Sequence, residues 1–333
     1  MIEELVLENF RGFRSLDLKG LKPVNLIVGH NNTGKTSLLE GILLSCQPVR
    51  GGELPGMFRA VQGRADLWYF PWLIRDGGQN DRANLMYKGE GGAVNSLALT
   101  KTNPPSLSGF IVTDPVTGEL LTDSKANFVG PVGNVSPLFL WRGPLHQDSN
   151  CRVVSVANRD PKTLVSLIGK AYRKRGGEET FQKLLATIDS RIKKVRIDPG
   201  EDGNQVVVDI GLSELLPLAQ VGQGVYRLAT ILADIIGEPT AVLLIDEIEN
   251  GLHHSVQKQV WTGLAEVARE LKVQIFATTH SGECLHAAHK AFVERQPYDL
   301  GVIQVFRGED GVQGRVLDKE HLEAAIAADI ELR

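Results

Sequence analysis

The feature that most constrains the fold of this chain is a glycine-rich loop set between an apolar run and a helical pattern. Residues 29–37 read GHNNTGKTS, which matches the pattern GxxxxGK[ST]. Residues 24–28 (VNLIV) have the length and apolar character of a buried strand, and Leu38, Leu39 and Ile42 follow at helical spacing. We therefore expect the loop to join a strand to the N-terminus of a helix, which is the context that this pattern requires.

A loop of this kind is suited to a polyphosphate. Its glycines let successive backbone N–H groups converge, the helix start adds unpaired donors and partial positive charge, and Lys35 supplies a full charge. Thr36 can offer its hydroxyl to Mg²⁺. The alternative, a turn with an exposed lysine, is disfavoured by the strand before it and the helix after it. The residues assigned to the nucleotide cradle are Gly29, Asn31, Asn32, Thr33, Gly34, Lys35, Thr36 and Ser37.

A second apolar run ends in two carboxylates. Residues 241–245 (AVLLI) are followed directly by Asp246 and Glu247. Ligands of open α/β sheets bind at the carboxyl ends of the strands, so this placement suits Mg²⁺-dependent phosphoryl chemistry. Asp246 is predicted to hold Mg²⁺, and Glu247 to orient and deprotonate the attacking water as general base. Acidic residues also commonly end strands and begin turns, but the phosphate loop favours the catalytic interpretation.

A third polar strand end follows. Residues 273–277 (VQIFA) are typical of a parallel strand and are followed by Thr278, Thr279 and His280. We expect His280 to lie at the same sheet edge as the phosphate loop and the two carboxylates. There its imidazole can hydrogen-bond a γ-phosphate oxygen, although a single histidine at a strand end is commonly a turn residue.

A second glycine-rich helix start comes before the carboxylate strand. It consists of Gly222, Gln223 and Gly224, and it has no lysine of its own. It can bind an anion through backbone N–H groups, or serve only as the turn that begins the helix. Within one subunit it has no phosphate to face, so the binding interpretation requires the nucleotide of another copy. The apolar face of the helix that follows is formed by Val225, Leu228, Ile231, Leu232 and Ile235.

The middle of the chain differs in character. Residues 47–160 hold short segments separated by glycine and proline pairs, which predicts a β-rich insertion. Its aromatic cluster at 68–72 is assigned to core packing, with a partner surface or base stacking as the alternative. Residues 161–197 are predicted to be helical and basic, which indicates either a solvated face or DNA contact. The basic residues are Lys170, Arg173, Lys174, Arg175, Arg191, Lys193, Lys194 and Arg196.

The overall charge and the cysteines limit the functional classes. The formal charge of the 333 residues is −4, so any contact with nucleic acid must come from a local basic face. Three widely separated cysteines argue against a disulfide framework or a zinc site and favour a reducing compartment. No signal peptide and no apolar run long enough for a membrane span can be recognised. We therefore expect a cytoplasmic protein without membrane contact.

Together, the order of these motifs resembles the ABC-type ATPases of the SMC, RecF and OLD group. The resemblance rests on residues 8–13 (ENFRGF), 29–36, 222–224, 245–253 (IDEIENGLH) and 278–281. The nearest match is the short branch called AAA-15 or AAA-21 ATPases, which are similar to the OLD ATPase module without its nuclease domain.

The resemblance covers residues 1–46 and 205–333. It implies an α/β P-loop NTPase fold of ABC/SMC-like type, with an N-terminal β-subdomain, a parallel sheet flanked by helices and an insertion at 47–204. It also implies ATP and Mg²⁺ as cofactors.

The same resemblance implies a role for each motif. Residues 29–37 correspond to Walker A and 245–247 to Walker B with the catalytic base. His280 corresponds to the switch histidine, and residues 222–224 to the signature that completes the partner's site. Residues 249–252, which include Asn250, correspond to the D-loop, and Arg11 to an arginine near the nucleotide.

Four departures from the family pattern stand out. The serine that usually begins the signature helix is missing, and Gln220 or Gln223 is expected to substitute for it. No Q-loop glutamine can be placed. No heptads predict the coiled-coil arms of SMC proteins. Residues 282–333 predict two helices and two strands, which is too little for a nuclease domain.

These features predict an ATPase that acts as a nucleotide-gated, head-to-tail homodimer. The resemblance implies a setting in DNA maintenance or anti-phage defence, with a separate nuclease or toxin as effector. The competing function is an ATP-binding regulatory or scaffold protein with negligible turnover. A monomeric kinase would share the phosphate loop, but it would explain neither residues 222–224 nor His280.

Overall fold

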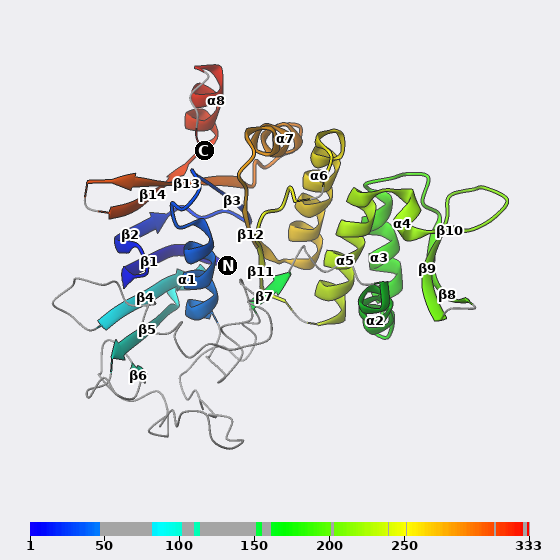
Figure 1. The fold of residues 1–333 in the computed structure, drawn as a ribbon, viewed down its shortest axis with the longest axis horizontal. Coiled ribbons are helices and arrows are strands. Elements are labelled where there is room, and N and C mark those ends of the chain that lie inside the picture. The colour runs from blue at the N-terminus through cyan, green and yellow to red at the C-terminus, as the bar shows by residue number, and fades with distance from the viewer. Residues whose placement is uncertain are drawn as a thin grey trace.

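The fold is that of a computed structural model, shown in Figure 1. It describes residues 1–46, 82–101, 110–113, 151–154, 161–200, 203–238, 240–250, 252–309, 311–328 and 332. The aromatic cluster at 68–72 and D-loop residue Gly251 lie outside these residues.

An 11-stranded sheet organises the molecule. Its strand order is β6-β5-β4-β1-β2-β14-β13-β3-β12-β11-β7. The strands are β1 (Ile2–Phe10), β2 (Phe13–Lys19), β3 (Val24–Val28), β4 (Arg82–Gly89), β5 (Val94–Lys101), β6 (Phe110–Thr113), β7 (Cys151–Val154), β11 (Val242–Ile245), β12 (Gln274–Thr278), β13 (Leu300–Gly308) and β14 (Gly311–Leu317).

The sheet has a parallel half and a mainly antiparallel half. Strands β7, β11, β12, β3 and β13 are parallel neighbours, whereas β1 pairs antiparallel with both β2 and β4. Every residue of β3, β11 and β12 is buried, as expected for strands covered on both faces. Because these three strands run in the same direction, the loops that follow them emerge at one edge of the sheet.

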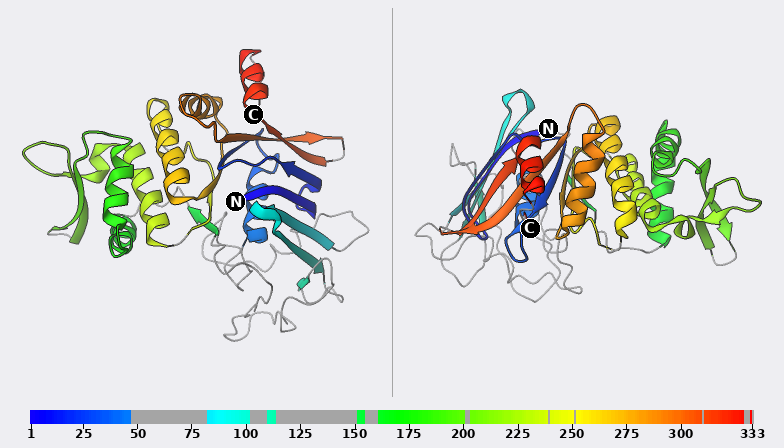
Figure 2. Two further views of the ribbon diagram at one scale, coloured as in Figure 1. Left: turned by 180° about the vertical axis from the view of Figure 1, so that it is seen from behind. Right: turned by 90° about the horizontal axis from the view of Figure 1, so that it is seen from above.

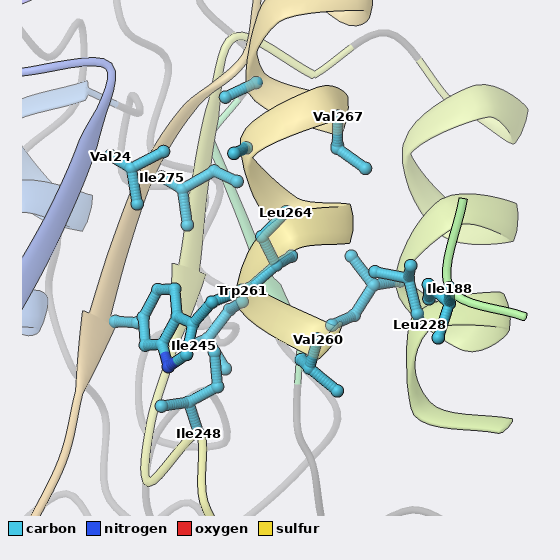
Figure 3. Close-up of a cluster of buried hydrophobic side chains, with 14 of the residues drawn as sticks. Val24, Ile188, Leu228, Ile245, Ile248, Val260, Trp261, Leu264, Val267 and Ile275 are labelled. Carbon is cyan, nitrogen blue, oxygen red and sulfur yellow. The ribbon is translucent and has the colours of Figure 1, made fainter. Parts of the chain in front are cut away.

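Helices cover the two faces of the sheet unequally. Helix α1 (Lys35–Cys46) packs with β1, β4 and β5 on one face. The opposite face is covered by α6 (His254–Leu271) and α7 (Gly282–Val293). Successive residues of β3 point to opposite sides, so that Leu26 joins one core cluster and Ile27 the other. Figure 3 shows Trp261 of α6 close to Ile245 and Ile248.

A helical lobe packs beyond α6. It contains α2 (Pro161–Tyr172), α3 (Gly177–Ala186), α4 (Leu218–Val221) and α5 (Gln223–Gly237). A small sheet adds β8 (Lys194–Gly200), β9 (Gly203–Asp209) and β10 (Leu216–Pro217). Both views of Figure 2 place this lobe away from β1, β2 and β14. The remaining elements are a 3₁₀ turn η3 (Glu90–Gly92) and α8 (Lys319–Ala327).

The predicted middle segment differs from the structure in one respect. Residues 161–197 were expected to be helical, but β8 begins at Lys194, so Lys194 and Arg196 lie on a strand. The alternation of Val195 and Ile197 with charged residues permits a strand, and the pairing with β9 selects it. The described strands β4 to β7 of residues 47–204 join the main sheet. The main sheet therefore takes strands from both sides of the boundary at 46, and the boundary at 205 falls within β9.

No helix in the described ranges has both the length and the apolar character needed to span a membrane. The cytoplasmic location stays a prediction.

Candidate functional site

Three loops meet at the carboxyl edge of the parallel strands. Strand β12 pairs with β3 on one side and with β11 on the other. The phosphate loop after β3, the carboxylates after β11 and the switch loop after β12 are consequently neighbours. The expected convergence of Lys35, Asp246, Glu247 and His280 is therefore present in the fold, although the role of each remains a prediction.

The phosphate loop folds tightly around its own lysine. Lys35 Nζ donates hydrogen bonds to the carbonyl oxygens of Gly29 and His30 at 2.6 and 2.8 Å. At Gly29, where φ is +152°, an added Cβ would lie 2.1 Å from the carbonyl oxygen of Val305. Any side chain larger than hydrogen would therefore displace the loop or β13.

Burial and nearby carboxylates act on Lys35 in opposite directions. The residue is only 4% exposed, and this burial lowers the pKa of its ammonium group. Glu249, Asp246 and Glu247 each raise that pKa, and Glu249 contributes the most of the three. The loop thus holds its cation near three acidic groups, which offset part of the cost of burying it.

Two oxygen donors suited to Mg²⁺ lie side by side. Thr36 Oγ1 is 3.4 Å from Asp246 Oδ2. Among the described residues no cluster of three or more His, Cys, Asp or Glu could hold a metal alone. Mg²⁺ commonly takes one or two protein oxygens and completes its shell with water and nucleotide phosphates. Thr36 and Asp246 are the residues that would hold it.

Thr278 is a site residue to which the sequence alone assigned no role. Its hydroxyl donates to Asp246 Oδ1 at 2.5 Å and accepts from the backbone N–H of Glu247 at 2.8 Å. It is fully buried at the end of β12. It therefore fixes one carboxylate and orients the turn that carries the other. The signal in the sequence was a hydroxyl residue at a strand end that precedes a histidine.

Glu247 and His280 face each other at the surface of the site. Glu247 has a left-handed backbone with φ of +50°, which turns the chain immediately after Asp246. His280 Nε2 lies 3.7 Å from Glu247 Oε1, and their side chains are 38% and 51% exposed. Both groups are consequently accessible to a bound nucleotide and to water.

A buried arginine links the second glycine-rich helix to this turn. Arg227 on α5 is 8% exposed. Its guanidinium donates to the carbonyl oxygens of Asn250 at 2.5 Å and Glu247 at 3.2 Å. The sequence signal was an arginine within an apolar helix pattern. Arg227 therefore ties the position of α5 to the turn that carries the proposed base.

Residues 222–224 do not lie at the phosphate loop of their own chain. They begin α5 beside the short α4, and Figure 1 shows this helix start well apart from α1 and the end of β3. Gly222 is the residue that precedes α5, and it has no side chain to cap the helix. Gln220 and Gln223 are exposed. An added Cβ at Gly224 would meet Val260 at 3.3 Å, so this glycine also permits close packing on α6. The first N–H groups of a helix have no partner within that helix, which makes those at this helix start candidate donors to a ligand.

Arg11 occupies a different position from the other predicted nucleotide contacts. Its guanidinium lies 2.8 Å from Glu40 Oε2 on α1, and both side chains are largely buried. Arg11 therefore fastens the turn between β1 and β2 to the helix that follows the phosphate loop. Its contact with nucleotide stays a prediction, as does that of the exposed Asn250.

Some of the predicted basic residues gather around one surface hollow. Lys174, Lys193 and Lys194 line a hollow of about 550 Å³ that also includes Glu178 and Glu179. Two segments of basic residues that are separate in the sequence thus meet, but acidic residues share their surface.

Two family models match separate parts of the chain. An "AAA ATPase domain" matches residues 1–47, and an "AAA domain, putative AbiEii toxin, Type IV TA system" matches residues 157–283. An "ATP/GTP phosphatase" of Helicobacter pylori is 20% identical and covers 89% of each chain. "DNA replication and repair protein RecF" of Actinobacillus pleuropneumoniae is 54% identical over 41 residues, which cover 12% of this chain and 11% of that protein.

Solved structures with the same fold come from SMC heads. The SMC head bound to the C-terminal winged-helix domain of ScpA has a TM-score of 0.60 and 16% identity, covering 96% of this chain and 98% of that one. The SMC head domain of Thermotoga maritima has a TM-score of 0.53 and 15% identity, with coverage of 95% and 98%. At these identities the likeness concerns the fold, and it confirms the predicted α/β P-loop class.

Proposed function

We propose, from the premise that this chain is an ABC/SMC-like ATPase of the AAA-15/AAA-21 type, that two copies close head-to-tail on two ATP molecules and hydrolyse them. Each site combines the phosphate loop of one copy with residues 222–224 of the other. The main support is the separation of these two elements within one chain (Figure 1). A backbone anion site that faces no phosphate in its own subunit gains one when a second copy approaches.

The proposed reaction is in-line attack of water on the γ-phosphate of ATP. Glu247 aligns the water and accepts its proton, while Lys35 and the backbone N–H groups of the loop stabilise the transferred charge. His280 donates a hydrogen bond to a γ-phosphate oxygen. Mg²⁺, when bound, neutralises charge on the phosphates. ADP and phosphate are the products, and loss of the γ-phosphate removes the ligand shared by the two copies.

Light scattering and phosphate release test the two halves of this proposal. With a non-hydrolysable ATP analogue and Mg²⁺, the measured mass should double relative to the protein without nucleotide. With ATP, phosphate should appear at roughly 1 s⁻¹ or faster. A protein that stays monomeric at saturating analogue would refute the shared site, and its phosphate release would then have to be explained by one chain.

The two rival functions give different results in the same assays. A scaffold would dimerise with ATP, but its phosphate release would lie far below about 1 s⁻¹ and would not change in Glu247→Gln. A small-molecule kinase would transfer the γ-phosphate to an acceptor other than water. The exposed Glu247–His280 pair favours hydrolysis over the scaffold, because a non-hydrolysing site has no need of a base beside the γ-phosphate.

We assign the ATPase to DNA maintenance or anti-phage defence, acting with a separate nuclease or toxin. The support comes from the similarity of part of the chain to a DNA replication and repair protein and of another part to a family described as a putative toxin of a toxin–antitoxin system. The SMC head that binds ScpA is a precedent for a head domain with a separate protein partner.

DNA contact is proposed at the hollow that contains Lys174, Lys193 and Lys194. Because each phosphate contact releases counterions, replacing all three lysines by alanine should reduce the salt dependence of DNA affinity by about 2–3 in log–log slope. The affinity should be measured by fluorescence anisotropy between low and physiological salt. Glu178 and Glu179 in the same hollow should keep the total slope small.

A triple variant elsewhere on the surface provides the matched control. Replacing Lys258, Lys290 and Lys319 by alanine removes the same charge from α6, α7 and α8. If both triple variants changed the slope equally, the effect would come from net charge and not from the hollow. If neither changed it, DNA contact at this surface would be excluded.

A further inference from the structure

Glu249 is a charged residue of the site that the proposed reaction leaves without a function. Its Oε1 accepts a hydrogen bond of 2.7 Å from the backbone N–H of His280. Its Oε2 is buried and has no hydrogen-bond partner among the described residues. Buried carboxylate oxygens are normally paired, because loss of water is costly for a charged group. A group kept in this state is more typical of a functional site than of a packing position.

The turn that carries Glu249 is attached to the end of β12 at several points. The backbone N–H of Ile248 donates to the carbonyl oxygen of Thr278 at 3.0 Å, and the N–H of Glu247 donates to the hydroxyl of Thr278. The bond from His280 to Glu249 lies two residues beyond Thr278, past the end of β12. It therefore extends the attachment from the strand end to the histidine itself.

The carboxylate also acts on the other side of the site. Of the three carboxylates that raise the pKa of Lys35, Glu249 has the largest effect. Glu249 thus acts electrostatically on the phosphate-loop lysine while it holds the backbone of the switch histidine. In the described part of the chain, Asp246 bonds to Thr278 and Glu247 faces the His280 side chain, whereas Glu249 bonds to the His280 backbone.

We infer that Glu249 is a positioning residue for hydrolysis, which acts by holding the backbone of His280 so that its imidazole stays beside Glu247. This inference rests on the proposed ATPase function. It assigns Glu249 an effect mainly on the chemical step, because its hydrogen bond reaches the backbone of His280, whereas its relation to Lys35 is electrostatic only.

Three substitutions of Glu249 separate the effect of side-chain length from the effect of charge. Glu249→Gln keeps the length of the side chain and one acceptor oxygen, so kcat should stay within about 5-fold of native. Glu249→Asp keeps the charge but shortens the side chain, and Glu249→Ala removes both. In these two variants kcat should fall by about 10–100-fold while KM for ATP changes by less than about 3-fold. Glu283→Ala, on the exposed first turn of α7, is the matched control.

A double-mutant cycle identifies the residue through which Glu249 acts. If Glu249 works by placing His280, Glu249→Ala should have little further effect on kcat in a His280→Ala background. Multiplicative losses in the double variant would overturn the inference. So would an Asp variant with native kcat, because a short carboxylate would then suffice, or a Gln variant that loses as much as Ala.

Hydrogen exchange separates failure of this inference from failure of the proposed function. The backbone N–H of His280 should exchange slowly in the native protein and in Glu249→Gln, and faster in the Asp and Ala variants. This measurement needs no ATP. If the native protein hydrolysed no ATP, the proposed function would fail, but the hydrogen bond from His280 to Glu249 could still be observed. If the His280 N–H exchanged equally fast in all four proteins, Glu249 would not hold the backbone of His280 in solution.

Discussion

Glu247→Gln should lower the rate of phosphate release by about 10²–10⁴-fold, because the amide cannot accept a proton from the attacking water. The substitution preserves the shape of the side chain, and Asp246, Thr36 and Lys35 remain in place, so ATP should bind with near-native affinity. Hydrolysis would then no longer separate the two copies, and the variant should accumulate as a dimer with ATP. Single-turnover phosphate release, calorimetry and light scattering measure the three effects.

Glu270→Gln is a suitable control for this experiment. Glu270 lies on the exposed surface of α6, where it pairs with Lys183, and its substitution should leave all three measurements unchanged. If Glu247→Gln hydrolysed ATP at the native rate, Glu247 would have no role as the base. If the variant lost ATP binding, the carboxylate would instead be part of the nucleotide cradle.

The parts of the site that could be predicted from the sequence are those with a local signal. The phosphate loop has a fixed motif between a strand and a helix, and α1 begins at Lys35 as that context requires. The strands before Asp246 and Thr278 are continuous apolar runs, which is the pattern of a sheet covered on both faces. Parallel strands then bring their carboxyl ends together, so the meeting of three loops followed from fold class alone.

The connections between these loops could not be predicted, because they depend on contacts between distant segments. The hydroxyl of Thr278 bonds to Asp246, 32 residues earlier, and no local pattern distinguishes it from an ordinary threonine at a strand end. Arg227 was recognisable only as a charged residue in an apolar helix. The pairing of β4 with β1 was equally hidden, since strand sequences indicate pleat and burial but not the partner strand.

These connections explain how the fold holds its proposed base in place. The turn after β11 is fixed from α5 by Arg227 and from β12 by Thr278. The two residues act on opposite polar groups of the turn: Arg227 donates to the carbonyl oxygen of Glu247, and Thr278 accepts from its N–H. Arg227 therefore connects α5, which carries residues 222–224 at its start, to the backbone of Glu247. In the proposed dimer, this helix is the one that meets the partner's nucleotide.

Lys35→Ala should weaken ATP binding at least about 100-fold, because it removes the one full charge that the loop directs at the phosphates. The native protein should melt at a higher temperature when ATP and Mg²⁺ are added, since a ligand at about 100 times its Kd adds about 2.7 kcal/mol to the free energy of unfolding. At the same ATP concentration the variant should gain at most about 0.4 kcal/mol, so its melting temperature should shift little. Lys183→Ala, which removes an exposed lysine of α3, should retain the full shift. Native ATP affinity in Lys35→Ala by calorimetry would contradict the assignment of the phosphate loop, and with it the shared site of the proposed dimer.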